Sequence, residues 1–405
     1  MRRRLGAVRL WSTFLVLGGR TDWANYKKPR PYDVLAFDPA GKWLDELPAK
    51  SDWRLGWKGE SWSLTDATGN TRPNWTVYGT FSLGQKYAYD PDTKAFYFYA
   101  GGSTFKYDPA LKQWKDLNPP THPEKELGGI LLWSSMCYDT DAKKFVLFGG
   151  GNIQTERGDP GTWTYSPNEN KWEQLKLATQ PPARANSRLV YDPVNKKTVL
   201  FGGDMLHELH ADVWTLDLSK GWEQRQPKRG PQPRAGHAML WLPKAKKVLL
   251  LGGYTHTSTV EYVASLYKAL PMEAWTYDAA TDEWQCNGHW EKDAPTGPSN
   301  FFLSATVNGN DEVLLLDSQN RAWTIRIDAD KPDPQLAAKY GSSPHLGLKR
   351  SGSHDPAWYD DVPKPDADKV AAELKDLPTN KWTIRPTPKR PLMNMDWGSA
   401  VFDPA

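Results

Sequence analysis

The chain has 405 residues, with 51 lysines and arginines against 48 aspartates and glutamates, and a formal net charge of +3 at pH 7. A balance this close to neutral argues against a strongly basic surface for nucleic acid or an acidic membrane. No run of about 18 apolar residues is present, so membrane insertion is not expected. The 21 tryptophans and 17 tyrosines suit pleated strands, and the 33 prolines and 32 glycines suit many turns.

The first residues, MRRRLGAVRLWSTFLVLGG, combine a basic start with an apolar stretch, as a short signal peptide does. The stretch FLVLGG is in register with later repeats, so cleavage after it would remove a strand. We therefore interpret it as part of the fold. The compartment stays unknown, and we expect export only if a signal lies upstream of a truncated N-terminus.

An apolar run that ends in a glycine pair recurs along the chain. Each run is followed by a polar loop, an aromatic strand, a turn and a tryptophan. The pairs end at Gly19, Gly102, Gly150, Gly203 and Gly253. A further unit, DEVLLLDSQNRAWTIRID, has Leu316-Asp317 in place of the glycines. From Gly102 onward the period is about 50 residues, which is typical of a repeat architecture.

Repeats of this period and content resemble the kelch repeat, the unit of a β-propeller. The resemblance implies an all-β fold, a six-bladed kelch-type β-propeller that forms a single domain over residues 1–405. It covers nearly the whole chain outside three insertions. It does not define a function, because one fold hosts many functions.

Residues 185–225 illustrate the expected four-stranded blade. SRLVYDP is a strand that ends at an Asp-Pro turn, KKTVLFGG returns, and ADVWTLDL and GWEQRQ follow. Glycine after the second strand removes side-chain bulk where strands crowd near the axis, and it permits left-handed backbone angles. In kelch proteins the later tryptophan fills the gap between blades. Here that position holds Trp43, Trp114, Trp172, Trp222 and Trp284.

The two ends of the chain have complementary patterns. Residues 397–405, WGSAVFDPA, match the first strand and turn of a blade, whereas the first blade begins with its second strand, TFLVLGG. We therefore predict that the C-terminal strand pairs beside residues 13–18 and closes the first blade. The alternative is that Trp397 opens a seventh blade or a second propeller, with RLGAVRL as a poor first strand of the first blade.

Three insertions interrupt the repeats. Residues 51–78 contain four tryptophans, which either form a small core of their own or stack on a ligand. Residues 254–273 include TVEYVASLYKAL, whose apolar spacing predicts a helix. Both are expected on the face that carries the loops between second and third strands, here called the site face. Residues 328–380, with a helix predicted over 366–377, are expected on the opposite face.

The stretch LFGGDMLHELHADVWTLDL contains His207, Glu208 and His210. Zinc-protease histidines are four residues apart on a helix, whereas these are three apart in a hairpin loop. We interpret them as part of a solvated loop and expect no metal or other cofactor. The tripeptide Arg157–Asp159 is likewise interpreted as a loop without an adhesion role. Cys137 and Cys286 are expected to be buried free thiols.

The best candidates for a site are at the entries to the first strands. PPARANSR and PQPRAGHA align Arg184 with Arg234, and such arginines can brace neighbouring loops through their five donors. Arg188 lies on an innermost strand, where a guanidinium must be paired or line a wet channel. Bracing and ligand contact are both open. The expected ligand-binding set around the axis is Arg184, Asn186, Arg188, Arg234, His237, Asn300, Asn152, Asp204, Tyr254 and Trp57.

Two classes of function remain. The first is a binding or scaffold module that presents an axial pocket to a protein, peptide or carbohydrate ligand. The second is a sugar-acting enzyme. Kelch propellers include sialic acid mutarotases, where Arg188 and His237 would supply acid–base chemistry, and galactose-oxidase-like copper enzymes, whose tyrosine, histidine and cysteine pattern is missing here. The sequence favours the binding module and does not specify the ligand.

Overall fold

The computed structural model describes residues 86–342 with gaps at 101, 112, 128–130, 153–156, 159–160, 206–207, 257–266, 296–302 and 318–320. It also describes Lys381 and the backbone of nine segments outside this range: 14–17, 34–38, 42–47, 50–51, 54–58, 61–65, 71–72, 383–385 and 399–402. Statements about side chains below concern the residues from 86 to 342.

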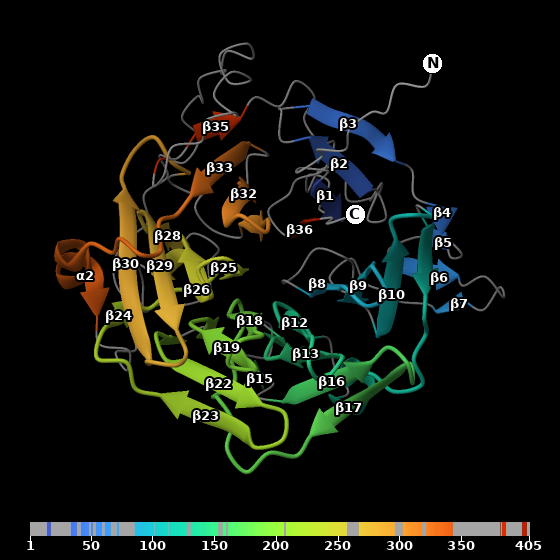
Figure 1. Ribbon diagram of the computed structural model, residues 1–405. Helices are drawn as coiled ribbons and strands as arrows, with labels where there is room; N and C mark the ends of the chain where they lie inside the picture. The colour runs from blue at the N-terminus through green and yellow to red at the C-terminus, as the bar shows by residue number, and fades with distance from the viewer. Residues whose placement is uncertain are drawn as a thin grey trace, which may run out of the picture.

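Antiparallel sheets surround a central axis as the blades of a propeller (Figure 1). Blades are numbered from the repeats of the sequence. Blade two contains β8 (Tyr87–Asp90), β9 (Ala95–Ala100), β10 (Ser103–Asp108) and β11 (Gln113–Asp116). Blade three contains β12 (Ser135–Asp139), β13 (Lys144–Phe148), β16 (Thr162–Ser166) and β17 (Lys171–Leu175).

Blade four contains β18 (Arg188–Asp192), β19 (Lys197–Phe201), β22 (Val213–Asp217) and β23 (Gly221–Arg225). Blade five contains β25 (Ala238–Leu242), β26 (Lys247–Leu251), β29 (Met272–Asp278) and β30 (Glu283–Trp290). Blade six contains β31 (Ser304–Val307), β32 (Glu312–Leu316), β33 (Ala322–Arg326) and β35 (Thr383–Arg385). In each of these five blades the strands lie in chain order from the axis outward, which confirms the predicted all-β propeller.

A further sheet contains both ends of the described chain. It has the order β3 (Lys42–Leu47), β2 (Val34–Asp38), β1 (Phe14–Leu17) and β36 (Ser399–Phe402). Strand β36 runs antiparallel to β1, with Phe14 opposite Phe402 and Leu17 opposite Ser399. Five blades are thus shown, against the predicted six, and closure of a further blade by residues 397–403 beside residues 13–18 stays a prediction. Strand β36 also contacts β31 and β8, the innermost strands of blades six and two.

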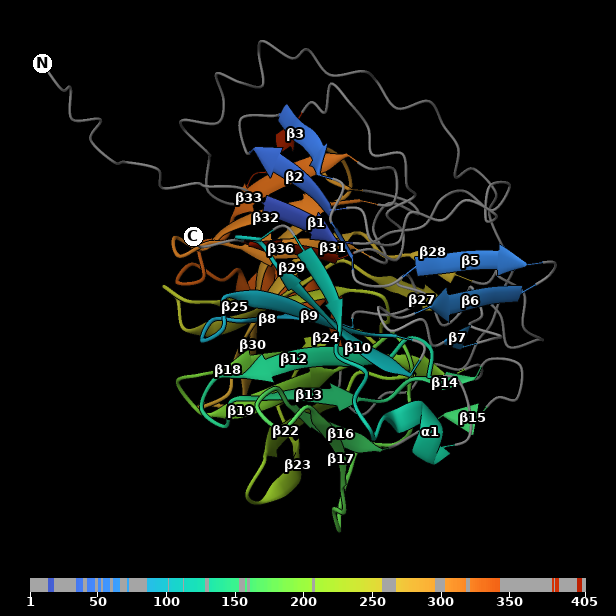
Figure 2. The ribbon, with the colours of Figure 1, turned by 90° about the vertical axis from the view of Figure 1, so that its right-hand side faces the viewer.

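Short ribbons extend the loops that follow the glycine pairs. They are β14 (Gly151–Asn152) with β15 (Arg157–Gly158), β20 (Asp204–Met205) with β21 (Glu208–Leu209), and β27 (Tyr254–His256) with β28 (Tyr267–Ala269). Insertion 51–78 forms a three-stranded sheet of β5 (Arg54–Lys58), β6 (Ser61–Thr65) and β7 (Thr71–Arg72). Before it, β4 (Lys50–Ser51) pairs in parallel with β11. Figure 2 shows β5–β7, β14–β15 and β27–β28 on one side of the propeller.

The prediction of a helix in insertion 254–273 is wrong for the residues that the structure describes. Tyr267–Ala269 is strand β28, which pairs with Tyr254–His256, while residues 257–266 lie outside the described part. The apolar spacing covered too few residues to separate a helix from a ribbon. The hydrogen bonds between β27 and β28 continue past the glycine pair and favour the extended backbone there.

The insertion after β33 contains a helix that the sequence analysis missed, α2 (Pro334–Tyr340). Asp333 caps it by accepting from the N–H groups of Gln335 and Leu336, and Pro334 stands in the first turn, where proline is favoured. The helix packs against β30, and β34 (Gly341–Ser342) pairs with β24 (Gly230–Pro231). The helix predicted over 366–377 lies outside the described residues. The other described helix is α1 (Pro123–Leu127).

Glycine pairs are required where one blade meets the next. Gly149 and Gly202 have φ values of +69° and +64°, and a β-carbon on either would overlap the carbonyl oxygen of an arginine in the following blade. The next glycine donates to that same oxygen, from Gly150 to Arg184 at 2.8 Å and from Gly203 at 2.9 Å to the equivalent arginine of blade five. The repeated Gly-Gly is therefore an inter-blade junction.

Tryptophans of the fourth strands fill the gaps between blades, as expected. Trp172 of β17 packs edge-to-face on Tyr99 of blade two at 5.1 Å between ring centroids, and its indole N–H donates to Thr104 at 2.8 Å. Trp222 repeats this arrangement one blade further on, against Phe148. Its indole N–H donates to the hydroxyl of a threonine on β16 at 2.7 Å. Each tryptophan thus buries apolar area that no single sheet could bury alone.

Replacing Trp172 with alanine removes this wedge. We expect Trp172→Ala to lower the free energy of unfolding by about 3–5 kcal/mol, because a large buried aromatic leaves a cavity. Trp172→Phe keeps a ring and should lose less. Leu111→Ala, at an exposed turn position, is the control and should change the value by less than about 0.5 kcal/mol. Urea unfolding of the three variants measures these differences, and equal losses for Trp172→Ala and Leu111→Ala would contradict the wedge.

Candidate functional site

The entries to three first strands are joined at the site-face end of the axis. Trp133, Asn186 and Gly236 occupy equivalent positions in blades three, four and five, and all three have left-handed backbone angles. The Asn186 N–H donates to the Trp133 carbonyl at 2.9 Å, and the Gly236 N–H donates to the Asn186 carbonyl at 3.0 Å. This chain of bonds holds the residues that follow each entry in a common register around the axis.

Arg184 is completely buried and uses its donors within the fold. Its guanidinium forms a two-point ion pair with Asp212, at 2.5 and 2.8 Å, and donates to the carbonyls of Gly202 and Pro182 at 3.1 Å. The Trp214 indole N–H donates to the same carboxylate at 2.7 Å. Arg184 therefore braces the glycine pair at which the chain leaves β19 of its own blade (the glycine exit), as the sequence analysis allowed.

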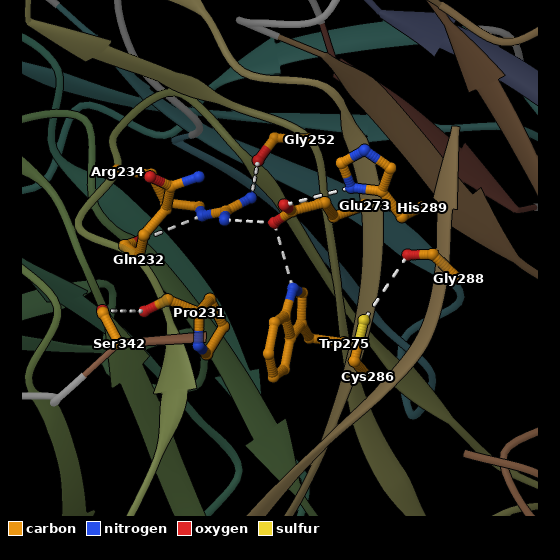
Figure 3. Close-up of polar contacts among 10 residues, drawn as sticks. All are labelled: Pro231, Gln232, Arg234, Gly252, Glu273, Trp275, Cys286, Gly288, His289 and Ser342. Atoms are coloured by element: carbon orange, nitrogen blue, oxygen red, sulfur yellow. Dashed lines mark hydrogen bonds and ion pairs between the residues drawn. The ribbon is translucent and has the colours of Figure 1, made fainter. Parts of the chain in front are cut away.

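Arg234 repeats this arrangement in blade five (Figure 3). Its guanidinium pairs with the buried carboxylate of Glu273 and donates to the carbonyls of Gly252 at 2.9 Å and Gln232 at 3.1 Å. Figure 3 also shows the indole N–H of Trp275 donating to Glu273, at 3.0 Å. On the other side of this carboxylate, His289 Nδ1 lies 3.5 Å from the second oxygen and the imidazole ring stacks on Tyr340 of α2 at 3.6 Å.

The two acidic partners were missed by the sequence analysis. Asp212 and Glu273 each stand two residues before the tryptophan of the third strand, in the two repeats whose entries carry the arginines. An acid at this spacing, in the same repeat as an entry arginine, was the signal that could have identified the pair. It was overlooked because third-strand residues were considered only for packing.

Ionisation of these acids is set by the arginines. Burial alone would raise the pKa of Asp212, but the charge and hydrogen bonds of Arg184 outweigh it and hold that pKa at about 2. Burial opposes ionisation of Glu273 in the same way, and Arg234 still lowers its pKa. Burial, followed by the charge of Arg184, lowers the pKa of His210 to about 4, so this imidazole is neutral near pH 7.

Asp204 links blades four and five at the site face. It accepts from the Asn186 side-chain amide at 3.0 Å and from the Tyr254 hydroxyl at 2.9 Å. Residues 204 and 254 also bridge to the entries of their own blades, at Ala185 and Ala235. Three residues of the predicted set therefore lie together, and they form a hydrogen-bonded unit.

Arg188 differs from the two bracing arginines. It is 4% exposed, its guanidinium donates to the Ser187 carbonyl at 3.0 Å, and no described carboxylate pairs with it. Burial lowers its pKa from 12.5 to about 10, so it stays charged at pH 7. Lys86, at the equivalent position of blade two, instead donates to the Leu131 carbonyl at 3.1 Å and has the charge of Glu124 nearby.

His237 is fully buried and neighbours the β18–β19 strand pair that contains Arg188. Its ring packs edge-to-face on Phe201 at 5.5 Å. Burial, and then the charges of Arg188 and Arg234, hold its pKa well below the usual range, so the imidazole is neutral. Within the described part of the chain, the positive charge of Arg188 therefore has no carboxylate to compensate it.

The side chains of the remaining predicted residues are outside the described part of the structure. Asn300 is outside the described residues, and Trp57 of β5 and Asn152 of β14 are described as backbone only. The same holds in the stretch with two histidines, where His207 is not described and Glu208 is described as backbone of β21. Among the residues with described side chains, no three metal-ligating groups come together.

Blades with paired glycines, inter-blade tryptophans and entry arginines define a kelch-type β-propeller. A family model agrees: the KLHDC2/KLHL20/DRC7 Kelch-repeats domain matches residues 100–316, more than half of the chain. The chain therefore belongs to the kelch-repeat family, whose domains generally bind protein partners. No curated protein matches the sequence significantly. Within the described part of the chain, no helix is long and apolar enough to cross a membrane.

Breaking the Arg184–Asp212 pair should be costly and should depend on pH. Asp212→Asn leaves a buried guanidinium without its counter-charge, so we expect the free energy of unfolding at pH 7 to fall by about 3–5 kcal/mol. The folded pKa of Asp212 lies below the value of ~3.9 for an unfolded aspartate. The stability that ionised Asp212 supplies is therefore present above about pH 4 and lost as the pH falls toward 2.

Urea unfolding of both proteins between pH 2 and pH 7 tests this expectation. The difference between wild type and Asp212→Asn should shrink below about pH 4, because the wild-type carboxyl is then protonated as well. Glu169→Gln, an exposed position of the β16–β17 turn, should match wild type at every pH. A difference that stayed constant down to pH 2 would show that the ion pair contributes little.

Proposed function

We propose that the protein is a scaffold that binds a protein or peptide ligand at the site-face end of the propeller axis. The observation that supports this most is Arg188, a buried and charged guanidinium that no described acid neutralises. A cation of this kind lowers stability unless something pairs with it, so its presence suggests that a ligand does so. The ribbons β14–β15 and β27–β28 rise on the same side.

The chemistry at this end favours a ligand with a carboxylate or several hydroxyls. Arginine binds carboxylates through two parallel hydrogen bonds. Asp204 and Asn186 add acceptor and amide groups at the same level. Trp57 is proposed to contribute a stacking surface from the insertion 51–78, and Asn152 and Asn300 to complete the polar rim.

Acid–base catalysis on a sugar is less well supported. His237, the expected proton-transfer group, is completely buried, and its pKa is held far below the range in which it would exchange protons near neutrality. Arg184 and Arg234, at the same face, are engaged with Asp212 and Glu273. These observations favour binding over catalysis.

We also propose that the ring closes with six blades through pairing of the two ends. Three observations support this: the register of β1 with β36, the contact of β36 with β31 and β8, and the four-stranded order of the end sheet. Closure by a late strand would make the first blade depend on residues almost 400 positions apart. It would also protect strand edges that would otherwise be open.

A peptide library tests the proposed ligand site. Peptides selected on the wild-type protein should bind Arg188→Met and Trp57→Ala at least about tenfold more weakly, since a buried charge-assisted contact is worth about 2–5 kcal/mol. Lys220→Gln, at an exposed turn between β22 and β23, removes the same charge at the end away from the glycine pairs and should bind normally. Selected peptides that bind all three variants equally well would refute the site.

Closure can be tested by a crosslink. Leu15 lies opposite Val401, and Val16 lies opposite Ala400, so one of the two cysteine pairs at these positions should form a disulfide in an oxidising buffer. The pair Leu15→Cys with Ser399→Cys is out of register by two residues and serves as the control. Non-reducing electrophoresis detects the circular product. No crosslink in either matched pair, or equal yield in the control, would favour the alternative of an open first blade.

A further inference from the structure

A group of four buried side chains at the entries to blades three, four and five has polar atoms without hydrogen-bond partners among the described residues. We call it the inner cluster: Ser134, Ser187, Arg188 and His237. The unpaired atoms are the two serine hydroxyls, Nε of Arg188 and both ring nitrogens of His237, and none of the four residues is more than 4% exposed. Buried polar atoms in native proteins are nearly always paired with protein, water or an ion.

The register of the blades places three of these residues at equivalent entries of adjacent blades. Ser134, Ser187 and His237 each follow one of the three left-handed residues that are hydrogen-bonded in a chain from blade three to blade five. Arg188 follows Ser187 directly and donates to its carbonyl. Arg188 lies opposite Phe201 in the sheet, and the His237 ring packs on Phe201 at 5.5 Å between ring centroids, so Arg188 and His237 share this neighbour. The unpaired atoms therefore come from three adjacent blades at one level of the axis.

No described carboxylate compensates the charge of the inner cluster. Arg188 is cationic, His237 is neutral, the serines are uncharged, and no described carboxylate pairs with the guanidinium. At Lys86, the equivalent position of blade two, burial lowers the pKa of the lysine and the nearby charge of Glu124 opposes this effect. At Arg188 the described residues supply no such acid, and an isolated buried charge is strongly disfavoured.

We propose that the inner cluster binds one small monovalent anion, which serves as the counter-ion of Arg188. The cluster can offer N–H and O–H donors from the guanidinium, both hydroxyls and one imidazole nitrogen, which suits chloride or a small carboxylate. One negative charge balances the single positive charge. The low exposure of all four residues restricts the site to a small ion. The inference shares Arg188 with the proposed ligand site, but it concerns the protein without a partner.

Thermal unfolding at constant ionic strength measures such binding. Sodium gluconate, whose anion is too large for the site, is replaced stepwise by sodium chloride or by sodium acetate. An ion that binds only the folded state raises the midpoint temperature of unfolding, and the rise levels off as the site fills. For a protein of this length we expect a rise of about 2–5 °C. A rise with chloride assigns a halide site, and a rise with acetate assigns a site for a carboxylate. No rise with either salt would overturn the proposal.

Variants show where the ion binds. Arg188→Met should abolish the anion-dependent rise, whereas Lys86→Met, which removes a cation at the equivalent position of blade two, should retain it. If Arg188→Met does not fold, Ser187→Ala is the second variant, and it should weaken the apparent affinity for the anion several-fold. The line width of the chloride-35 resonance compares chloride binding by wild type and variant without unfolding the protein. A rise that persists in Arg188→Met would place the ion elsewhere and contradict the proposal. Peptide binding that depends on Arg188 would be unaffected by that outcome, so the two proposals fail separately.

Discussion

The structure depends on the junction where a glycine pair of one blade meets the entry arginine of the next. At this point a backbone N–H donates to the arginine carbonyl, as from Gly203 to Arg234 at 2.9 Å. The arginine side chain then returns to the glycine exit of its own blade and to the acid of the third strand. No side chain fits between the two backbones. Each blade, too small to be stable alone, is thereby fixed to its neighbour in one register.

This junction also explains why a site can form at the axis. Because Trp133, Asn186 and Gly236 are hydrogen-bonded in sequence, the residues that follow them are held on rigid elements. Arg184 and Arg234 use their donors for bracing, so neither has the uncompensated charge found at Arg188. The repeat thus places two kinds of arginine four residues apart in one strand entry. Arg184 holds neighbouring blades together, whereas no described carboxylate pairs with Arg188.

Much of the fold could be predicted from the sequence, because its signals are local and repeated. The glycine pairs, the Asp-Pro turns and the late tryptophans each act within one blade or between neighbours, and the structure places them as expected at Gly203 and Trp222. The helix predicted around Tyr267 was wrong because a few apolar positions cannot distinguish a helix from a ribbon. The site was less predictable. Arg184 is paired with Asp212, 28 residues further along the chain, and the spacing of this acid before the third-strand tryptophan would have indicated the pair. That no described acid pairs with Arg188 could be seen only in the folded chain.

Arg184 and Arg188 have different roles: we propose that Arg184 stabilises the fold whereas Arg188 serves a bound group. The free energies of unfolding of Arg184→Met and Arg188→Met, measured by urea in a gluconate buffer without chloride, test this claim most directly. Arg184→Met should lose about 3–5 kcal/mol, because it leaves Asp212 as an unpaired buried charge. Arg188→Met should be neutral or more stable than wild type, because it replaces an uncompensated buried cation with an apolar side chain. A loss for Arg188→Met as large as that for Arg184→Met would contradict the account.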